Sequence, residues 1–509
     1  MKKTILLLIL IVVLSAPLHA QDGLTLTVLG SFNHGAYDEG AAEIAAYDAA
    51  SKTVYVVNGD SKTIDLLDIS DPAAPALKSQ IDVTAYGDSA NSVAVYDGLV
   101  AVAIEADPKQ EPGLVGFFNA DGSFISSVPV GALPDMLTFT PDGSKVLTAD
   151  EGEPSDDYTV DPLGSVSIID LSGGVENAAV STLTFEGIEL DPTIRVYGPG
   201  ASAAQDIEPE HIAVSPDGST AYVTLQENNA LAVIDINAGA IVSVIPLGFK
   251  DHSQPGNELD AGKDDGVVNI ASWPLLGMYQ PDGIAAYNVG DALYLVTANE
   301  GDTREYDGYS EEGELGETPV DEDFPGLADL LTEDAILGLE IVTSIGDTDG
   351  DGDLDQLYLP GARSFSIWAS DGTLVFDSGA DFERITAEAF PDDFNSTNDE
   401  NGDFDGRSDN KGPEPEGVAL GEINGRMYAF IGLERIGGVM VYDITDPMAV
   451  SYVTYVNNRD FSGDAEAGTA GDLGPEGLLF IPAATSPNGA NLLVVTNEIS
   501  GTTTIYEIQ

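Results

Sequence analysis

A short pattern recurs along the chain and constrains its fold more than any other feature. In each copy an acidic or amide residue precedes a short apolar run, which predicts a β-strand. The copies begin at Glu43, Asn91, Asp135, Glu210, Asp282, Glu416 and Glu476. The small sheet formed by one copy cannot bury both of its faces alone, so the copies are expected to pack against one another.

Each copy continues as consecutive hairpins. Residues 409–444 contain an Asn-Gly turn at 424–425, an apolar strand at 427–433 and a last strand that ends at Asp443. Pro-Asp-Gly turns at 141–143 and 216–218 follow other copies, with proline fixing the first corner and glycine supplying positive φ. The pattern therefore predicts an all-β chain, a seven-bladed β-propeller with long acidic loop insertions. The strand at 24–32 is expected to complete the last blade beside 502–508 and close the ring.

The predicted organisation is a signal peptide at residues 1–20 and a single propeller domain at residues 21–509. The spacing between repeats exceeds the 40–45 residues or so of a bare blade, and the largest insertion covers about 301–412. Within it, 324–339 is the one predicted helix. Strands are predicted at 356–360, 364–369 and 373–376, and they either finish the fifth blade, which we favour, or form an eighth.

The first residues have the features of a secretion signal. Lys2 and Lys3 precede an apolar run at 5–14, and the segment ends at the small residue Ala20. This run is shorter than the roughly 20 residues that a membrane span requires. The sequence predicts a secreted monomer, extracellular or periplasmic, with no membrane span after cleavage. Because the chain has no cysteine, its stability must come from the core, ring closure or metal.

The chain is strongly acidic, with 87 Asp and Glu residues against 18 Lys and Arg residues and a formal charge of −69. Such a charge excludes nucleic acid and anionic membranes as natural partners. It also repels itself unless cations or salt screen it. Two explanations fit and both stay open: adaptation to a saline medium, and the binding of divalent cations.

Two rings of acidic and amide residues are predicted at one mouth of the propeller. One ring consists of the residues that open the repeats, and the other follows the next strand, at 58, 105, 150–151, 226–227, 299–300, 434 and 497–498. Converging carboxylates need raised pKa values or a bound cation, and hard oxygen ligands favour calcium. The alternative is that these residues cap turns and stay solvated. The candidate metal ligands in the rings are Glu43, Asp150, Glu151, Glu210, Glu300, Glu416, Glu434, Glu476 and Glu498.

A second calcium candidate lies in the insertion. Aspartates alternate along the loop at Asp347, Asp349, Asp351, Asp353 and Asp355, with a glycine at its sixth place. This is the beginning of a calcium-binding loop, although the position of the final EF-hand glutamate is Tyr358. The alternative is a flexible acidic turn. Residues 399–406 form a weaker candidate of the same kind.

The few basic residues gather near the insertion and the acidic mouth. Metal ions with nearby arginines would stabilise the charge that develops on a phosphate ester. The candidate catalytic residues are therefore Glu300 and Glu416, as ligands or base, and Arg304 and Arg435, as clamps. Neutralisation of the carboxylates through salt bridges is the alternative role of these arginines.

Several longer motifs resemble the choice-of-anchor I proteins, bacterial secreted relatives of the mesenchyme-specific cell surface glycoprotein. They lie at 149–154, 298–302, 361–367, 408–417 and 430–438. The resemblance implies a seven-bladed propeller of the YVTN or quinoprotein-like kind. Some relatives are called alkaline phosphatase or phytase-like esterase, which implies a phosphorylated small molecule as substrate.

Three functional hypotheses follow. The first is a secreted, calcium-dependent phosphoesterase with calcium as its cofactor. The second is a non-catalytic extracellular binding or matrix protein in which calcium makes loops rigid. The third is a quinoprotein-like redox enzyme, for which no residue of the sequence identifies a cofactor site.

Overall fold

The computed structural model describes residues 23–262, 265–332 and 335–509. The predicted signal peptide lies outside these ranges. Among the described residues, most strands belong to four-stranded antiparallel sheets, of which seven are present. None of the described helices has the length and apolar character needed to cross a bilayer.

Five of these seven sheets are built from four consecutive strands, whereas the fifth contains an insertion and the last includes the first strand of the chain. The first three sheets contain β2 (Ala45–Asp48), β3 (Thr53–Asn58), β4 (Thr63–Asp68) and β5 (Ala76–Asp82); β6 (Ala90–Tyr96), β7 (Leu99–Ile104), β8 (Pro112–Asn119) and β9 (Phe124–Ala132); and β10 (Pro134–Phe139), β11 (Lys145–Asp150), β12 (Ser165–Asp170) and β13 (Ala179–Thr184). The fourth and fifth contain β14 (Ile212–Val214), β15 (Thr220–Leu225), β16 (Ala230–Asp235) and β17 (Ala240–Pro246); and β20 (Ile284–Val289), β21 (Ala292–Asn299), β27 (Ser364–Ala369) and β28 (Leu374–Asp377). The last two contain β29 (Pro415–Ile423), β30 (Arg426–Leu433), β31 (Val439–Asp443) and β32 (Ser451–Val456); and β33 (Pro475–Ile481), β34 (Asn491–Asn497), β35 (Thr502–Ile508) and β1 (Leu26–Asn33).

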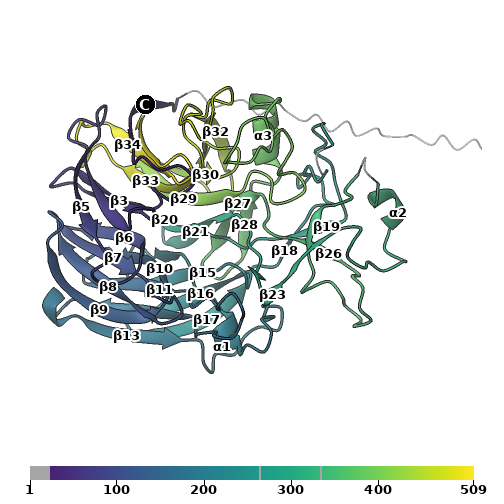
Figure 1. The fold of residues 1–509 in the computed structure, drawn as a ribbon, viewed down its shortest axis with the longest axis horizontal. Coiled ribbons are helices and arrows are strands. Elements are labelled where there is room, and N and C mark those ends of the chain that lie inside the picture. Colours follow the sequence, from purple (N-terminus) through teal and green to yellow (C-terminus); the bar gives the residue numbers. More distant parts are fainter. Residues whose placement is uncertain (1–22, 263–264, 333–334) are drawn as a thin grey trace, which may run out of the picture.

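The sheets follow one another in a closed ring (Figure 1). Their first strands line a common central cavity, which we call the channel. The first strand of each sheet contacts the first strand of the next, in the order β2, β6, β10, β14, β20, β29, β33 and back to β2. Apolar side chains fill the space between neighbouring sheets. Leu147 and Val166 of the third sheet, for example, share one cluster with Val223 and Ala232 of the fourth. This arrangement is that of a β-propeller.

The N-terminal strand belongs to the sheet of the last repeat. β1 pairs antiparallel with β35, and the register joins Leu26 to Ile508 and Asn33 to Thr502. His34, directly after β1, has its Nδ1 atom 2.6 Å from Asp65 Oδ2 in the first sheet and its Nε2 atom 2.9 Å from Thr503 Oγ1. Both ends of the described chain therefore lie in one sheet, which also contacts the first sheet.

The insertion between β21 and β27 forms a small structure beside the ring, together with residues 249–278 that precede the fifth sheet. β18 (Phe249–Asp251), β19 (Leu275–Met278) and β26 (Leu357–Leu359) form one sheet, in which β19 and β26 are parallel. β22 (Glu305–Tyr306) and β23 (Tyr309–Ser310) form a short hairpin, and β24 (Glu312–Glu314) pairs antiparallel with the more distant β25 (Glu340–Val342). A separate apolar cluster around Leu315, Phe324 and Ile341 packs these pieces together.

The predictions for the insertion are partly wrong. Two of the three predicted strands complete the fifth sheet as β27 and β28, as we favoured. The third, β26, instead joins the three-stranded sheet with β18 and β19. The predicted helix at 324–339 is reduced to α2 (Leu327–Leu330), and residues 333–334 lie outside the described ranges. Gly338 takes a φ of +86°, and the backbone of Gly338 and Leu339 pairs with Leu315 just before β25 begins, so the chain does not continue as a helix there.

The other described helices are α1 (Ala203–Asp206), α3 (Asp381–Ala389) and a 3₁₀ turn, η1 (Val175–Asn177). The sequence analysis did not predict α3. This helix buries Phe382, Ile385 and Thr386 against the fifth and sixth sheets, at the spacing of one helical face.

Candidate metal centre

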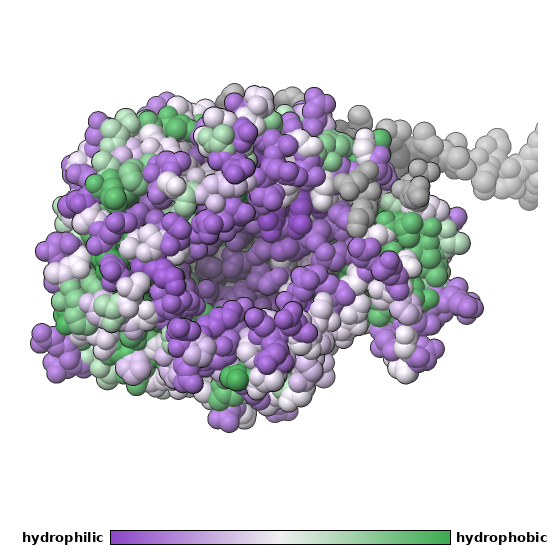
Figure 2. All heavy atoms as spheres, in the orientation of Figure 1, coloured by the Kyte–Doolittle hydropathy of each residue, from purple (hydrophilic) through white to green (hydrophobic). Residues whose placement is uncertain are grey.

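Antiparallel pairing brings the acidic residues of each repeat to the same end of its sheet. In the fourth sheet, Ile212 pairs with Val223, so Glu210 before β14 and Glu227 after β15 lie at one end. The same geometry applies in the other sheets, and the ring therefore collects carboxylates at one mouth of the channel. Figure 2 shows hydrophilic residues around a hollow at the centre of one face of the molecule.

In the third and fifth sheets, the two neighbouring residues at the end of the second strand have different surroundings. Asp150 is fully buried within its sheet and accepts hydrogen bonds from the hydroxyls of Thr148, Ser165 and Ser167 at 2.6–2.9 Å. Asn299 is also bonded within its own sheet, where its side-chain amide donates to the hydroxyl of Ser366. The neighbouring residues Glu151 and Glu300 instead reach carboxylates from other sheets. The structure thus places Asp150 among hydroxyl donors of its own sheet. Within the described ranges, Asp150 does not belong to any of the carboxylate groups that are close enough together to hold a metal ion.

One group, the buried triad, consists of Glu151, Glu210 and Glu227. One oxygen of each lies within 4.8 Å of the others. Glu210 is 7% exposed and Glu227 is 4% exposed, and the Oε2 atom of each is buried without a hydrogen-bond partner. A buried carboxylate oxygen without a partner is costly. This triad offers the oxygen ligands that a hard divalent cation prefers.

A second group, the open triad, consists of Asp282, Glu300 and Glu416, and its members are only partly buried. Asp282 also lines the cavity of the channel, and its Oδ1 atom lies 2.8 Å from Nδ1 of His211. Glu416 Oε2 has no hydrogen-bond partner. Glu300 belongs to a further group with Glu414 and Glu434, so one carboxylate is shared by two groups that could each hold an ion.

Cations at the two ends of the insertion reach into this mouth. Arg304 is 2% exposed and pairs with Asp206 and with Glu208, the latter at 2.8 Å. At the other end, Lys411 Nζ lies 2.8 Å from Glu300 Oε1. Arg435, from the turn after β30, donates to Glu414 Oε2 at 2.7 Å. The two arginines predicted as phosphate clamps are therefore already engaged by carboxylates of the chain.

The sequence Glu-Pro-Glu occurs twice at the mouth, and its two glutamates differ in role. Glu208 and Glu414, the first of each pair, bind arginines, whereas Glu210 and Glu416 belong to the two triads. The analysis of the sequence missed Glu208 and Glu414, although the repeated motif is a signal that could have identified them. It also missed Lys411 as a partner of Glu300.

The charges at the mouth perturb its carboxyl groups strongly. Burial, followed by the charges of Glu498 and Asp135, raises the pKa of Glu43 to about 8. Burial and neighbouring carboxylates raise the pKa values of Glu151, Glu210, Glu416, Glu434 and Glu476 well above the usual range. Glu414 differs: although burial opposes it, the charges of Lys411, Arg435 and Arg407 hold its pKa well below the usual value. Without a cation, several of these groups must keep their protons.

The remaining predicted ring residues also lie at the mouth. Glu43 and Glu498 contribute to the raised pKa of Glu476, after the contribution of burial. Glu476 lines the cavity, and its Oε2 atom is buried without a partner. These three residues are not part of the triads.

The acidic loop of the insertion separates into two groups. Asp347, Asp349 and Asp351 are exposed and near one another, whereas Asp353 and Asp355 lie with Asp321. Asp321 lies far before the loop in the sequence, in the segment that precedes α2, and was not predicted as a ligand. Thr348 donates to Asp355 Oδ2 through both its backbone nitrogen and its hydroxyl group, at 2.7 and 2.6 Å.

Comparison with known proteins identifies a family for most of the chain. Residues 43–447 match the model of the choice-of-anchor I domain. Gigasin-3a of Magallana gigas is 30% identical over 190 residues, which are 35% of this chain and 67% of that protein. The mesenchyme-specific cell surface glycoprotein of Strongylocentrotus purpuratus is 28% identical over 277 residues, 47% of this chain and 35% of that protein. The match thus spans about a third of the sea urchin glycoprotein.

Solved propeller structures are similar at low identity. A chain of hydrazine synthase from Kuenenia stuttgartiensis has a TM-score of 0.48 and 13% identity, and the match covers 93% of this chain and 97% of the other. The β-propeller domain of Cps50 (Swd1) from Myceliophteria thermophila has a TM-score of 0.44 and 9% identity, with 95% and 100% covered.

Proposed function

The chain belongs to the choice-of-anchor I domain family, and we propose that it is an extracellular β-propeller that binds calcium in its central channel. Extracellular placement is supported by the predicted signal peptide and by the curated relative that is called a cell surface glycoprotein. The calcium site is proposed from the carboxylates of the chain itself.

The observation that carries the proposal is the buried triad. Glu210 and Glu227 are more than nine-tenths buried, and each has an oxygen without a hydrogen-bond partner. One oxygen of each lies within 4.8 Å of an oxygen of Glu151. The guanidinium groups near the triad have other partners: Arg304 pairs with Asp206 and Glu208. Arg195 donates to the backbone carbonyl of Glu227 and pairs with Glu311. Carboxylates held this close repel one another, and a cation between them would offset that repulsion. Calcium accepts such an oxygen-rich, irregular ligand set, whereas magnesium keeps several waters in a strict octahedron.

We extend the proposal to the acidic loop of the insertion. Its two carboxylate groups, at Asp347, Asp349 and Asp351 and at Asp321, Asp353 and Asp355, are exposed or half-buried. Ions there would bind more weakly than in the buried triad, because water competes for exposed ligands. Their role would be to order the loop.

Calcium titration of the mature protein tests the proposal. Isothermal titration calorimetry should detect binding. Calcium at a hundredfold excess over its dissociation constant should add about 2.7 kcal/mol to the free energy of unfolding and so raise the melting temperature. Glu227→Gln should remove the tightest site. Glu189→Gln, an exposed carboxylate elsewhere on the ring, is the matched control and should bind like the unaltered chain. Equal binding by both variants would rule out the buried triad.

A second candidate function is hydrolysis of phosphate esters at the open triad. It is favoured by Glu300, which is shared between two groups of carboxylates and would bridge two ions, as in two-metal hydrolytic sites. Ions at this position would polarise a phosphoryl oxygen and activate water. Lys411 is held at the site by Glu300, and His211 by Asp282. Since Arg304 and Arg435 are engaged elsewhere, Lys411 and His211 replace them as the cationic groups beside a bound phosphate.

Turnover separates this candidate from a purely binding function. Hydrolysis of an aryl phosphate monoester and diester would be measured with calcium, with a chelator, and with Glu416→Gln. Calcium-dependent turnover that Glu416→Gln abolishes and Glu189→Gln retains supports the hydrolase. Calcium binding without turnover leaves the non-catalytic binding protein.

A further inference from the structure

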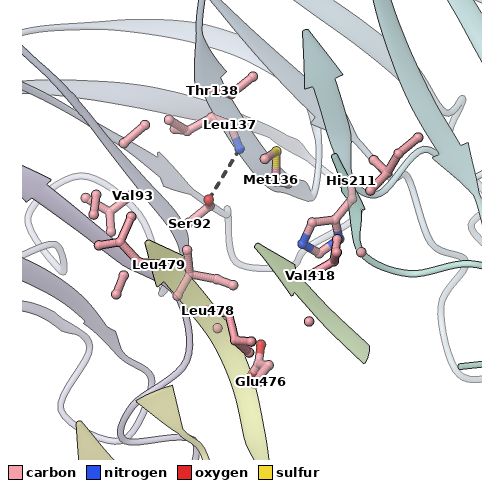
Figure 3. Close-up of a pocket in the computed structure, with 18 of the residues that line it drawn as sticks. Ser92, Val93, Met136, Leu137, Thr138, His211, Val418, Glu476, Leu478 and Leu479 are labelled. Carbon is pink, nitrogen blue, oxygen red and sulfur yellow. Dashed lines mark hydrogen bonds between the residues drawn. The ribbon is translucent and has the colours of Figure 1, made fainter. Parts of the chain in front are cut away.

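The channel contains a cavity of about 330 Å³ whose two parts differ in chemistry. His211, Asp282 and Glu476 lie at its polar end. The rest of its wall is largely apolar and comes from the innermost strands of different sheets. We call this part the apolar shaft, lined by Val93, Met136, Leu137, Val418, Leu478 and Leu479. Figure 3 shows these side chains around a common space, with His211 and Glu476 toward one side.

The apolar shaft is unusual for the centre of so acidic a protein. Val93 and Leu137 are buried, whereas Met136, Leu478 and Leu479 remain partly accessible. Contact between apolar side chains and water is unfavourable in free energy. An apolar ligand that covered these side chains would remove that cost and so bind favourably. The cavity volume is at the lower end of the range of small-molecule sites, which are concave and mostly apolar with a few polar groups.

The shaft is continuous with the open triad. Asp282 belongs both to the triad and to the wall of the cavity, and Glu416 directly precedes Gly417 and Val418 of the wall. A cation on Asp282, Glu300 and Glu416 would therefore face the cavity. Protein ligands from three carboxylates leave positions on such an ion that an oxyanion can fill.

We propose that the cavity binds a small amphiphile whose oxyanion head group ligates the cation of the open triad and whose apolar tail occupies the apolar shaft. This inference rests on the cation binding proposed above and adds the chemistry of the ligand to it. A phosphate ester of a short alkyl or aryl alcohol has the required form. A simple inorganic anion would leave the shaft in contact with water.

Alkylphosphonates of increasing length test the proposal, because their carbon–phosphorus bond resists hydrolysis. Binding to the calcium-loaded protein would be measured by calorimetry for ethyl-, butyl- and hexylphosphonate. Each added methylene group should tighten binding about fourfold until the shaft is full. A flat series would overturn the proposal, since the tail would then lie in solvent.

Paired variants locate the tail. Met136→Trp fills the shaft and should abolish the gain with chain length, whereas Met448→Trp, at a residue that is 76% exposed, should preserve it. Leu479→Gln is a second test that adds no bulk, and Leu374→Gln on the outer strand β28 is its control. Equal chain-length dependence in all four variants would place the tail outside the shaft and overturn the proposal.

Two further measurements distinguish the possible failures. Calcium titration of the same samples without phosphonate tests the cation site by itself: absence of calcium binding overturns the proposed function, whereas calcium binding with a flat phosphonate series overturns only the amphiphile. Hexylammonium is tested with calcium-free protein. If it binds more tightly than hexylphosphonate binds the calcium-loaded protein, the ligand is an organic cation and the oxyanion head is wrong.

Discussion

Glu414 and Glu416 are separated by one proline, yet their surroundings give their charges opposite effects. Glu414 is fully buried and contacts Arg407, Lys411 and Arg435. Glu416 faces other carboxylates and has an unpartnered oxygen. The negative charge is therefore required at one position and is unfavourable, without a cation, at the other.

Substitution of each glutamate by glutamine should change the stability of the calcium-free protein in opposite directions. Glu414→Gln leaves three cations without their common partner and should cost about 3–5 kcal/mol. Glu416→Gln removes a like-charge repulsion and should raise the melting temperature. Urea unfolding in the presence of a chelator measures both. Destabilisation of similar size in both variants would mean that Glu416 has a positively charged partner in the calcium-free protein.

The order of the strands could be predicted because each blade repeats a local pattern. The prediction of an all-β propeller follows from apolar runs, turn residues and repeat spacing, all of which are local. The insertion has no such repeat. Its elements depend on contacts between distant segments, such as β26 with β19 and β25 with β24. The α3 helix could have been predicted, since Phe382, Ile385 and Thr386 have the spacing of one helical face.

The strand β1 completes a sheet, so its removal should affect the whole ring. A chain that begins at Gly35 lacks β1 and the His34 side chain that contacts Asp65 and Thr503. It exposes the edge of β35, and exposed edges promote association. We expect a lower melting temperature and self-association in size-exclusion chromatography.

A peptide of residues 24–34 added in trans provides the control for this deletion. It should restore the monomer and most of the lost stability, because strand pairing supplies the missing hydrogen bonds. A deletion variant as stable as the full chain would mean that β1 contributes little to the ring.

The proposed metal sites were only partly predictable from sequence. The two rings were predicted from strand ends, which are local features of the sequence. They could not separate Asp150 from Glu151, because the separation depends on hydroxyls at Ser165 and Ser167 of the next strand. Nor could they identify Lys411 as a partner of Glu300, since the two residues are 111 positions apart in the sequence.

The concentration of carboxylates predicts how the stability of the molecule depends on pH. A carboxyl group whose pKa is raised on folding stabilises the fold below its unfolded value, near 4.5 for glutamate. It loses that contribution as the pH rises through the folded value, about 8 for Glu43. The calcium-free protein should therefore melt at lower temperature at pH 8 than at pH 5. Calcium should raise the melting temperature more at pH 8, and its binding should release protons.

Differential scanning fluorimetry across this pH range, with calcium or with a chelator, measures the effect. Sodium chloride at matched ionic strength is the control for simple screening of the charge of −69. If sodium chloride stabilises the protein as much as calcium does, salt adaptation explains the acidity. A melting temperature that is independent of pH without calcium would contradict the raised pKa values.

The pairing of β1 with β35 also orders events during biosynthesis. Leu26 is among the first described residues to be synthesised, and its partner Ile508 is among the last. Five of the other six blade sheets can form from four consecutive strands as the chain emerges, but this one must wait until β35 has been made. The first strand therefore stays unpaired during translation and export, when it depends on chaperones for protection from aggregation. A chain that ends before β35 lacks the pairing partner of β1 and therefore cannot close the ring.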